Sequence, residues 1–210
     1  MSVCPKRFYQ VDFFNDVIEH CWPTNEKPKN PVVVSEIKMS GFGNVDFVIA
    51  DVSKDGETVN EFVSVEMQAV DITGSVEPAY QGILNSESTV KVSYGINWAN
   101  VRKRYISQLV TKGFYHHHWN SKIVAVLQTR LYDSMRKHIK FDELPPETGG
   151  NTIVFMLYEF QPSEEVDGAY VLKLDRVVGT SHNRLMMGAM YQQIPPKADF
   201  CNRIIRNLNR

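Results

Sequence analysis

VDFVIA at Val45–Ala50 and FVSVEMQ at Phe62–Gln68, joined by a loop that contains Asp55-Gly56, decide the fold of this chain. Both stretches are rich in β-branched and aromatic residues, which predicts two neighbouring β-strands. Successive side chains on a strand point to opposite faces, so Glu66 and Gln68 share one face and the apolar residues that alternate with them share the other. One face therefore packs, and the other carries groups that can do chemistry.

A second carboxylate, Asp46, lies on the first of these strands. Carboxylates and an amide on rigid strands make a small pocket of oxygen ligands, which suits a hard divalent cation such as Mg²⁺. The three polar residues Asp46, Glu66 and Gln68 therefore form a candidate site for the hydrolysis of phosphodiesters.

The register between the two strands decides whether the carboxylates meet. A two-residue turn at Asp55-Gly56 would pair Asp46 with Val65 and leave Glu66 on the opposite face. For Asp46 and Glu66 to converge, the connection must hold an odd number of residues or a β-bulge. The sequence therefore predicts an irregularity in this hairpin.

The composition indicates which broad class of protein this chain belongs to. Of the 210 residues, 43% are apolar and 22% are charged, which is ordinary usage for one globular domain with its own core, here residues 1–210. No run approaches the ~18 apolar residues that span a bilayer, and the first residues lack the apolar core of a signal peptide, so we expect a cytoplasmic protein without membrane contact. Three widely separated cysteines argue against a disulfide framework and a metal ribbon.

The net charge of −1 conceals two oppositely charged segments. Between Phe42 and Glu87, nine acidic residues accompany one basic residue, a net charge of −8. Between Arg102 and Lys140, nine basic residues accompany one acidic residue, a net charge of +8. A metal-binding acidic patch beside a basic surface that attracts phosphates is what metal-dependent cleavage of a nucleic acid needs. Charge that is merely solvated is the alternative.

Apolar periodicity and turn residues predict the other elements. Helices are expected over residues 8–21, from an N-cap at Asn97 onward and after Pro195-Pro196, and strands over 32–38, 123–128, 152–158 and, as an edge strand, 170–174. In the helix after Asn97, an apolar stripe is formed by Trp98, Val101, Tyr105, Leu109 and Val110. The polar side of this helix is either a solvated face or a surface that contacts DNA phosphates, and its candidate residues are Arg102, Lys103 and Lys112.

Three phrases between Gly43 and Arg104, GNVDFVIAD, EFVSVEMQAVDITG and INWANVRKR, carry a resemblance to a known family. They resemble the NotI family of type II restriction endonucleases, which uses Gln where most relatives have Lys. The wider pattern, a strand with Asp, a turn, a strand with Glu-x-Gln and then a helix, resembles the core of the PD-(D/E)XK nuclease superfamily. The implied fold is an α/β restriction-endonuclease-like core, with a mixed central sheet flanked by helices.

The resemblance also implies roles for individual residues. Asp46 and Glu66 become ligands of Mg²⁺, the main-chain carbonyl of Met67 a further ligand, and Gln68 the group that positions the attacking water. The implied activity is sequence-specific cleavage of double-stranded DNA that leaves 5′ phosphates. A homodimer is implied too, because two subunits related by a two-fold axis cut both strands of a palindrome most simply.

Two departures from the family pattern limit what is transferred. The namesake holds an iron with four cysteines, whereas here only Cys4 and Cys21 precede the site, so we expect no iron. The chain is also much shorter than the namesake, so the recognised DNA sequence is not transferred.

Several individual residues can be interpreted either as structural or as functional. Glu36 is either a surface charge on a strand edge or an extra acidic residue of the site. His116–His118 are expected to be a cluster at a helix end, because three consecutive helical side chains point about 100° apart and cannot converge on one ion. Ser181-His182 has no identifiable acidic companion for a serine hydrolase.

Two other functions stay open. A catalytically inactive DNA-binding or interaction protein on a nuclease-like fold would also carry a Gln in place of the usual Lys. A structure-specific repair or junction nuclease is the third possibility, and it would prefer branched substrates.

Overall fold

The computed structural model describes residues 5–41, 43–69, 72–90, 92, 94–97, 101–191 and 196–208; of Pro5, Ile96 and residues 101–103 it describes the backbone alone. The helices are η1 (Pro5–Gln10), α1 (Phe13–Cys21), α2 (Glu77–Leu84), the π-helical turn η2 (Val101–Ile106), α4 (Ser107–His118), α5 (Thr129–His138), α6 (His182–Met190) and α7 (Lys197–Leu208). The strands are β1 (Pro31–Lys38), β2 (Asn44–Val52), β3 (Val59–Gln68), β4 (Ile72–Thr73), β5 (Gly95–Ile96), β6 (Lys122–Gln128), β7 (Ile153–Pro162) and β8 (Tyr170–Thr180).

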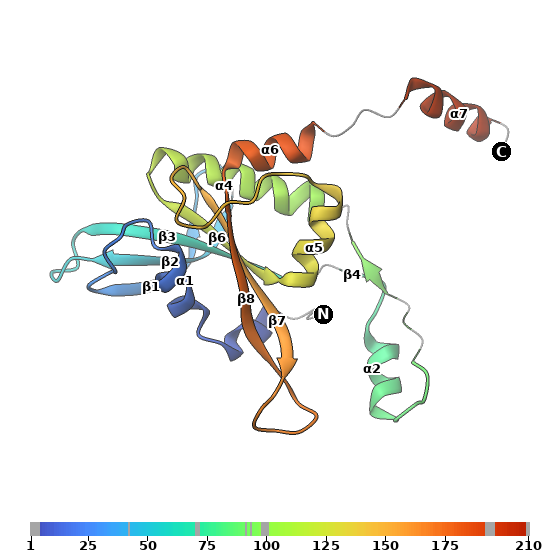
Figure 1. Cartoon of the computed structure of the whole chain (residues 1–210), viewed down its shortest axis with the longest axis horizontal. Coiled ribbons are helices and arrows are strands. Elements are labelled where there is room, and N and C mark those ends of the chain that lie inside the picture. The colour runs from blue at the N-terminus through green and yellow to red at the C-terminus, as the bar shows by residue number, and fades with distance from the viewer. Residues whose placement is uncertain are drawn as a thin grey trace.

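Six strands form one mixed sheet in the order β1-β2-β3-β6-β7-β8. The central strands β3, β6 and β7 run parallel, and the outer pairs are antiparallel. Parallel neighbours need a crossover, which α4 provides between β3 and β6 and α5 between β6 and β7. Figure 1 shows α4, α5 and α6 on one side of the sheet and α1 on the other. The predicted α/β class, a mixed sheet flanked by helices, is confirmed.

The central strands supply both layers of the core. On β6, Ile123, Ala125 and Leu127 belong to the cluster under α4 and α5, while Val124 and Val126 belong to the cluster under α1. A strand buried on both faces reads as a continuous apolar run rather than an alternating one. The edge strand β1 is the opposite case, because all eight of its residues are exposed.

The N-terminal segment forms two elements, so the helix predicted over residues 8–21 is confirmed over Phe13–Cys21, and its predicted beginning is wrong. Asp12 interrupts it by capping α1, and its side chain accepts a hydrogen bond from the main-chain N–H of Asn15 at 3.2 Å. Aspartate is a favoured N-cap because its carboxylate satisfies an N–H that has no partner inside the helix. The buried face is consequently Phe13, Val17 and Cys21.

The other predicted elements agree with the structure. The expected strands correspond to β1, β6 and β7 and to the first half of β8, which is an edge strand as predicted. The final helix is α7. The helix expected from Asn97 is described from Val101, and residues 98–100 lie outside the described residues. None of the helices in the described part of the chain is long and apolar enough to cross a bilayer.

Candidate active site

A β-bulge brings the two acidic residues of the hairpin opposite each other. Phe47 on β2 pairs with Val65 on β3, and one position further along the same register places Asp46 opposite Glu66. Near the turn the register shifts, because β3 carries one extra residue, Asn60. Opposite residues of an antiparallel pair point to the same face. The predicted irregularity is confirmed, and it is what allows the two carboxylates to share a face.

The carboxylate of Asp51 holds this bulge. It accepts hydrogen bonds from Nδ2 of Asn60 at 3.1 Å and from the main-chain N–H groups of Asn30 at 2.7 Å and Lys29 at 2.9 Å. These donors, Asn30 foremost, favour the charged form and lower the pKa of Asp51. Asp51 was not among the predicted functional residues, and its hydrogen bonds tie the bulged residue Asn60 to the segment before β1.

Glu66 is a buried carboxylate in an unusual electrostatic position. Burial raises the pKa of Glu66 to about 7, and the nearby charge of Asp46 adds to that rise. The ammonium of Lys112 acts in the opposite direction, because it donates a hydrogen bond to Oε1 of Glu66 and pairs with its charge. A carboxylate in this setting favours a cation beside it.

Asp46 is only half-buried, and its carboxylate is held by backbone. Oδ2 accepts a hydrogen bond from the main-chain N–H of Met67 at 2.8 Å. Asp46 on β2 is thereby fixed against the residue that follows Glu66 on β3. Gln68 is also half-buried, and its side-chain amide donates to the carbonyl oxygen of Ala69.

Lys112 lies inside the protein, so its expected place on the polar side of a helix is wrong. It is 1% exposed, and besides Glu66 its Nζ contacts the main-chain oxygen of Asn44 at 2.8 Å. The sequence did contain a signal for this, because Lys112 follows Tyr105 and Leu109 at helical spacing along the apolar stripe. The side chains of Arg102 and Lys103 lie outside the described residues, and their contacts with DNA stay a prediction.

The hydroxyl of Tyr105 also lies near the carboxylates. Tyr105 is 4% exposed, and in the described part of the chain its hydroxyl has no hydrogen-bond partner. Burial, then the charges of Glu66 and Asp46, hold its pKa well above the ordinary value, so the group stays a neutral donor. Sequence reasoning placed Tyr105 in the apolar stripe and missed its polar end.

Glu36 lies across from the site on the neighbouring edge strand. The pairing of β1 with β2 passes from Ser35 with Phe47 to Ile37 with Val45, so Glu36 falls opposite Asp46. Its φ of 55° is rare for a residue other than glycine, and it interrupts the regular ladder. Glu36 is exposed.

The family model described as Restriction endonuclease NotI matches residues 1–172. The chain belongs to the NotI restriction endonuclease family. Membership indicates a sequence-specific DNA endonuclease, that is, a hydrolase that acts on DNA. No curated protein matches the chain. The predicted family is confirmed, and the matched range contains Asp46, Glu66, Gln68 and Lys112.

Two further histidine features of this NotI-family chain have structural explanations. His116–His118 end α4, as predicted, with His116 buried and the other two exposed. Ser181 caps α6 by accepting a hydrogen bond from the main-chain N–H of Arg184 at 3.3 Å. The neighbouring His182 donates its main-chain N–H to Oγ1 of Thr152 at 3.0 Å.

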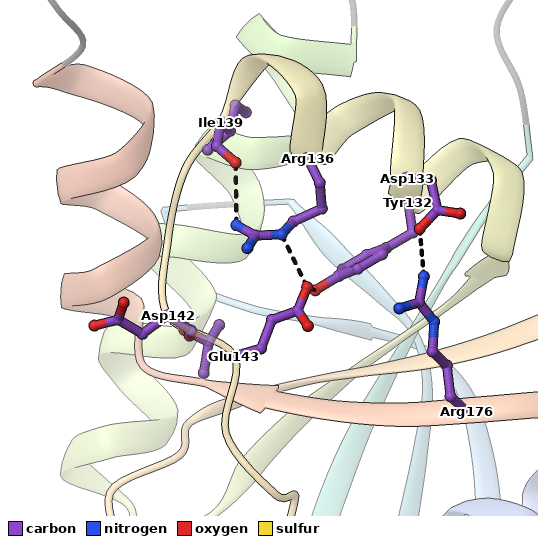
Figure 2. Close-up of polar contacts among 8 residues, drawn as sticks. Tyr132, Asp133, Arg136, Ile139, Asp142, Glu143 and Arg176 are labelled. Atoms are coloured by element: carbon purple, nitrogen blue, oxygen red, sulfur yellow. Dashed lines mark hydrogen bonds and ion pairs between the residues drawn. The ribbon is translucent and has the colours of Figure 1, made fainter.

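Part of the basic segment between residues 102 and 140 is neutralised by internal ion pairs. Figure 2 shows Arg136 donating to Glu143, which also accepts from the hydroxyl of Tyr132. Asp133, the acidic residue of the segment, is paired with Arg176 from outside it. Arg130 lies within 3.3 Å of Glu159. Since Lys112 is paired as well, the positive surface that this segment offers to DNA is smaller than its sequence charge suggests.

Proposed function

We propose that this member of the NotI family is a Mg²⁺-dependent endonuclease that hydrolyses phosphodiester bonds in double-stranded DNA and leaves 5′ phosphates. The main support is the register of β2 and β3, which sets Asp46 opposite Glu66 on one face of the sheet. The arrangement of strands and following helix also supports the PD-(D/E)XK core that the sequence resembles. A single nuclease domain over residues 1–210 stays part of this proposal.

The residues at the site fit a magnesium ion. Asp46 and Glu66 offer carboxylates from adjacent strands, and the main-chain carbonyl of Met67 would be the third ligand. Within the described ranges, no three His, Cys, Asp or Glu side chains gather into a group that could hold a metal. Mg²⁺ is commonly held by one or two carboxylates and keeps several waters. The repulsion between the two carboxylates, one cause of the raised pKa of Glu66, is relieved by a shared cation.

When bound, Mg²⁺ polarises the scissile phosphate, lowers the pKa of a coordinated water and stabilises the charge on the departing 3′ oxygen. Asp46 and Glu66 hold their positions through the main-chain N–H of Met67 and the ammonium of Lys112, so little reorganisation is needed. The amide of Gln68 can orient the attacking water, but it cannot accept a proton near neutral pH. The proton therefore leaves through solvent or a neighbouring phosphate.

DNA binding is proposed to involve Arg102 and Lys103, at the start of the helix that leads to the site. Basic side chains at this position would contact phosphates and fix the register of the enzyme on the duplex. We also propose a homodimer, because two-fold symmetry matches two cleavage sites to the two strands of a palindrome. Sedimentation of the purified protein, alone and with duplex DNA, measures this directly.

Cleavage of mixed-sequence DNA by the purified protein tests the proposed function. With Mg²⁺ we expect discrete fragments, and with EDTA none. Fragments that a DNA ligase rejoins without prior phosphorylation carry 5′ phosphates. Absence of nicking with Mg²⁺, Mn²⁺ or Co²⁺ contradicts the proposal. Branched substrates cut faster than linear duplex would instead select a structure-specific nuclease.

One observation favours a second candidate, a catalytically inactive DNA-binding protein on this fold. The amide of Gln68 donates to Ala69 rather than to either carboxylate, so the described structure gives it no contact with the acidic pair. DNA binding without cleavage, together with an Asp46→Ala variant that behaves like the wild type, would select this candidate.

A further inference from the structure

Lys112 is the charged side chain most deeply enclosed at the candidate active site. Its exposure is 1%, and its Nζ contacts Oε1 of Glu66 and the main-chain oxygen of Asn44. Removing an ammonium from water is costly unless nearby acceptors replace its hydration. Both acceptors here belong to the two strands that carry the acidic residues, so Lys112 joins β2 to β3 at the site.

The position of α4 makes this contact possible. Leu109, one turn before Lys112, is fully buried in the core, and Gly113 packs directly against β7. A Cβ at Gly113 would lie 2.7 Å from Cγ1 of Ile153, which is closer than side chains tolerate. The absence of a side chain there lets the helix approach the sheet closely enough for Lys112 to reach Glu66.

Two other roles for Lys112 fit the structure less well. A buried ammonium cannot contact a DNA phosphate without leaving its two acceptors, so a direct role in DNA binding is disfavoured. A purely stabilising role is also weak, because buried ion pairs can often be replaced by apolar residues without loss of stability. The neutral Gln68, two residues after Glu66, contributes no positive charge to the site.

We infer that Lys112 is a positioning residue of the proposed nuclease: from α4 its ammonium holds the Glu66 carboxylate in the orientation that coordinates the divalent cation. This inference rests on the proposed function. Lys112 contacts Oε1 of Glu66. The cation would take the other carboxylate oxygen, so that both positive groups would share Glu66. Removing a side chain that hydrogen-bonds a metal ligand typically lowers metal affinity or activity about 10–100-fold.

Binding of Mn²⁺ without DNA tests the inference. Calorimetric titration of the wild type, Lys112→Met, Lys112→Arg and the control Lys137→Met, which removes an exposed lysine of the next helix, compares their affinities. We expect Lys112→Met to weaken Mn²⁺ binding about 10–100-fold. Lys112→Arg should recover part of the loss, and Lys137→Met should bind as the wild type does. DNA affinity measured without metal should change less than about twofold in Lys112→Met, since its ammonium does not reach DNA.

A double-variant comparison separates positioning from a general effect on the fold. If Lys112 acts through Glu66, adding Lys112→Met to Glu66→Gln should cause no further loss of Mn²⁺ affinity. Circular dichroism and thermal unfolding accompany each variant. If Lys112→Met does not fold, Lys112→Gln, which keeps a hydrogen-bond donor, replaces it in the same comparison.

The outcomes distinguish this inference from the proposed function. Wild-type protein that binds neither Mn²⁺ nor Mg²⁺ overturns both. Wild-type binding and cleavage that Lys112→Met matches, or Mn²⁺ binding that becomes tighter in Lys112→Met, overturns the inference alone. Tighter binding would mean that the ammonium competes with the metal instead of orienting its ligand.

Discussion

The main-chain N–H of Met67 donates a hydrogen bond to Oδ2 of Asp46 at 2.8 Å, one residue after Glu66 along β3. The two carboxylates are therefore fixed relative to each other by backbone as well as by strand register. Because the donor is a peptide group, this restraint survives changes in the surrounding side chains.

Asp46→Asn should remove most of the activity while preserving the fold. The amide oxygen of asparagine can still accept from the N–H of Met67, but the negative charge that attracts the cation is lost. We expect the cleavage rate to fall at least about a hundredfold, roughly 3 kcal/mol of transition-state stabilisation. Single-turnover cleavage measures the rate, and DNA affinity in Ca²⁺ measures binding. The exposed Asp167→Asn is the matched control, and equal loss in both variants would contradict the assigned role.

His116→Leu should stabilise the protein and reduce its sensitivity to acid. His116 is fully buried, and neither ring nitrogen has a hydrogen-bond partner among the described residues. Burial, then the charge of Lys112, lowers its pKa from 6.5 to about 3. Between about pH 6.5 and pH 3 the imidazole of His116 is protonated in the unfolded chain and neutral in the folded protein. The free energy of unfolding therefore decreases as the pH falls from 6.5 toward 3.

Urea unfolding at pH 7 and pH 5 measures both effects. We expect His116→Leu to gain about 1–3 kcal/mol at pH 7, since a buried group without partners is removed. Between pH 7 and pH 5 the free energy of unfolding should fall less in His116→Leu than in the wild type. The difference between the two proteins should grow by up to ~1.4 kcal/mol for each pH unit below 6.5. His118→Leu, at an exposed position two residues further along α4, is the matched control. Identical slopes in His116→Leu and the wild type would show that folding does not lower the pKa of His116.

Glu143→Ala should destabilise the region drawn in Figure 2. Oε1 of Glu143 accepts from the hydroxyl of the fully buried Tyr132 at 2.8 Å and from Nε of Arg136 at 2.9 Å. Removing the acceptor leaves a buried hydroxyl unpaired, which costs about 1–3 kcal/mol. The neighbouring Asp142→Ala, whose side chain is 83% exposed, should change stability by less than about 0.5 kcal/mol. In a Tyr132→Phe background the cost of Glu143→Ala should shrink, and an undiminished cost would argue against the hydrogen bond.

Gly113→Ala should lower both stability and activity. The added methyl group would meet Cγ1 of Ile153 at 2.7 Å and its Cδ1 at 2.9 Å, in a core where neither can move freely. Overpacking of this kind costs about 1–3 kcal/mol, more than the ~1 kcal/mol that alanine gains in a helix. Thermal unfolding measures the loss, and Gly149→Ala, where nothing lies within 4 Å, is the control. Unchanged stability would mean that α4 can shift outward without cost.

The strands and the site hairpin could be predicted because their signals are local. Alternation places Glu66 and Gln68 on one face. A turn with an even number of residues would leave Asp46 and Glu66 on opposite faces, so a bulge was expected, and Asn60 supplies it. Helical spacing from Tyr105 and Leu109 indicates that Lys112 faces the sheet. Its contact with Glu66 could not be predicted, because it depends on how closely α4 approaches the sheet at Gly113. The break at Asp12 was missed for a different reason. The apolar periodicity continues across Asp12, but the side chain of Asp12 caps a new helix there instead of lying inside one.

The matched family range ends at residue 172, inside β8, which has implications for recombinant fragments. A fragment cut there would keep three residues of β8, and most of the outer edge of β7 would lose its hydrogen-bonded neighbour. It would also lose α6, which packs on α4. An apolar strand with an open edge invites association with other chains, so such a fragment should aggregate when expressed. Boundaries for crystallisation trials are better set after α6, at residue 191, than at the end of the recognisable homology.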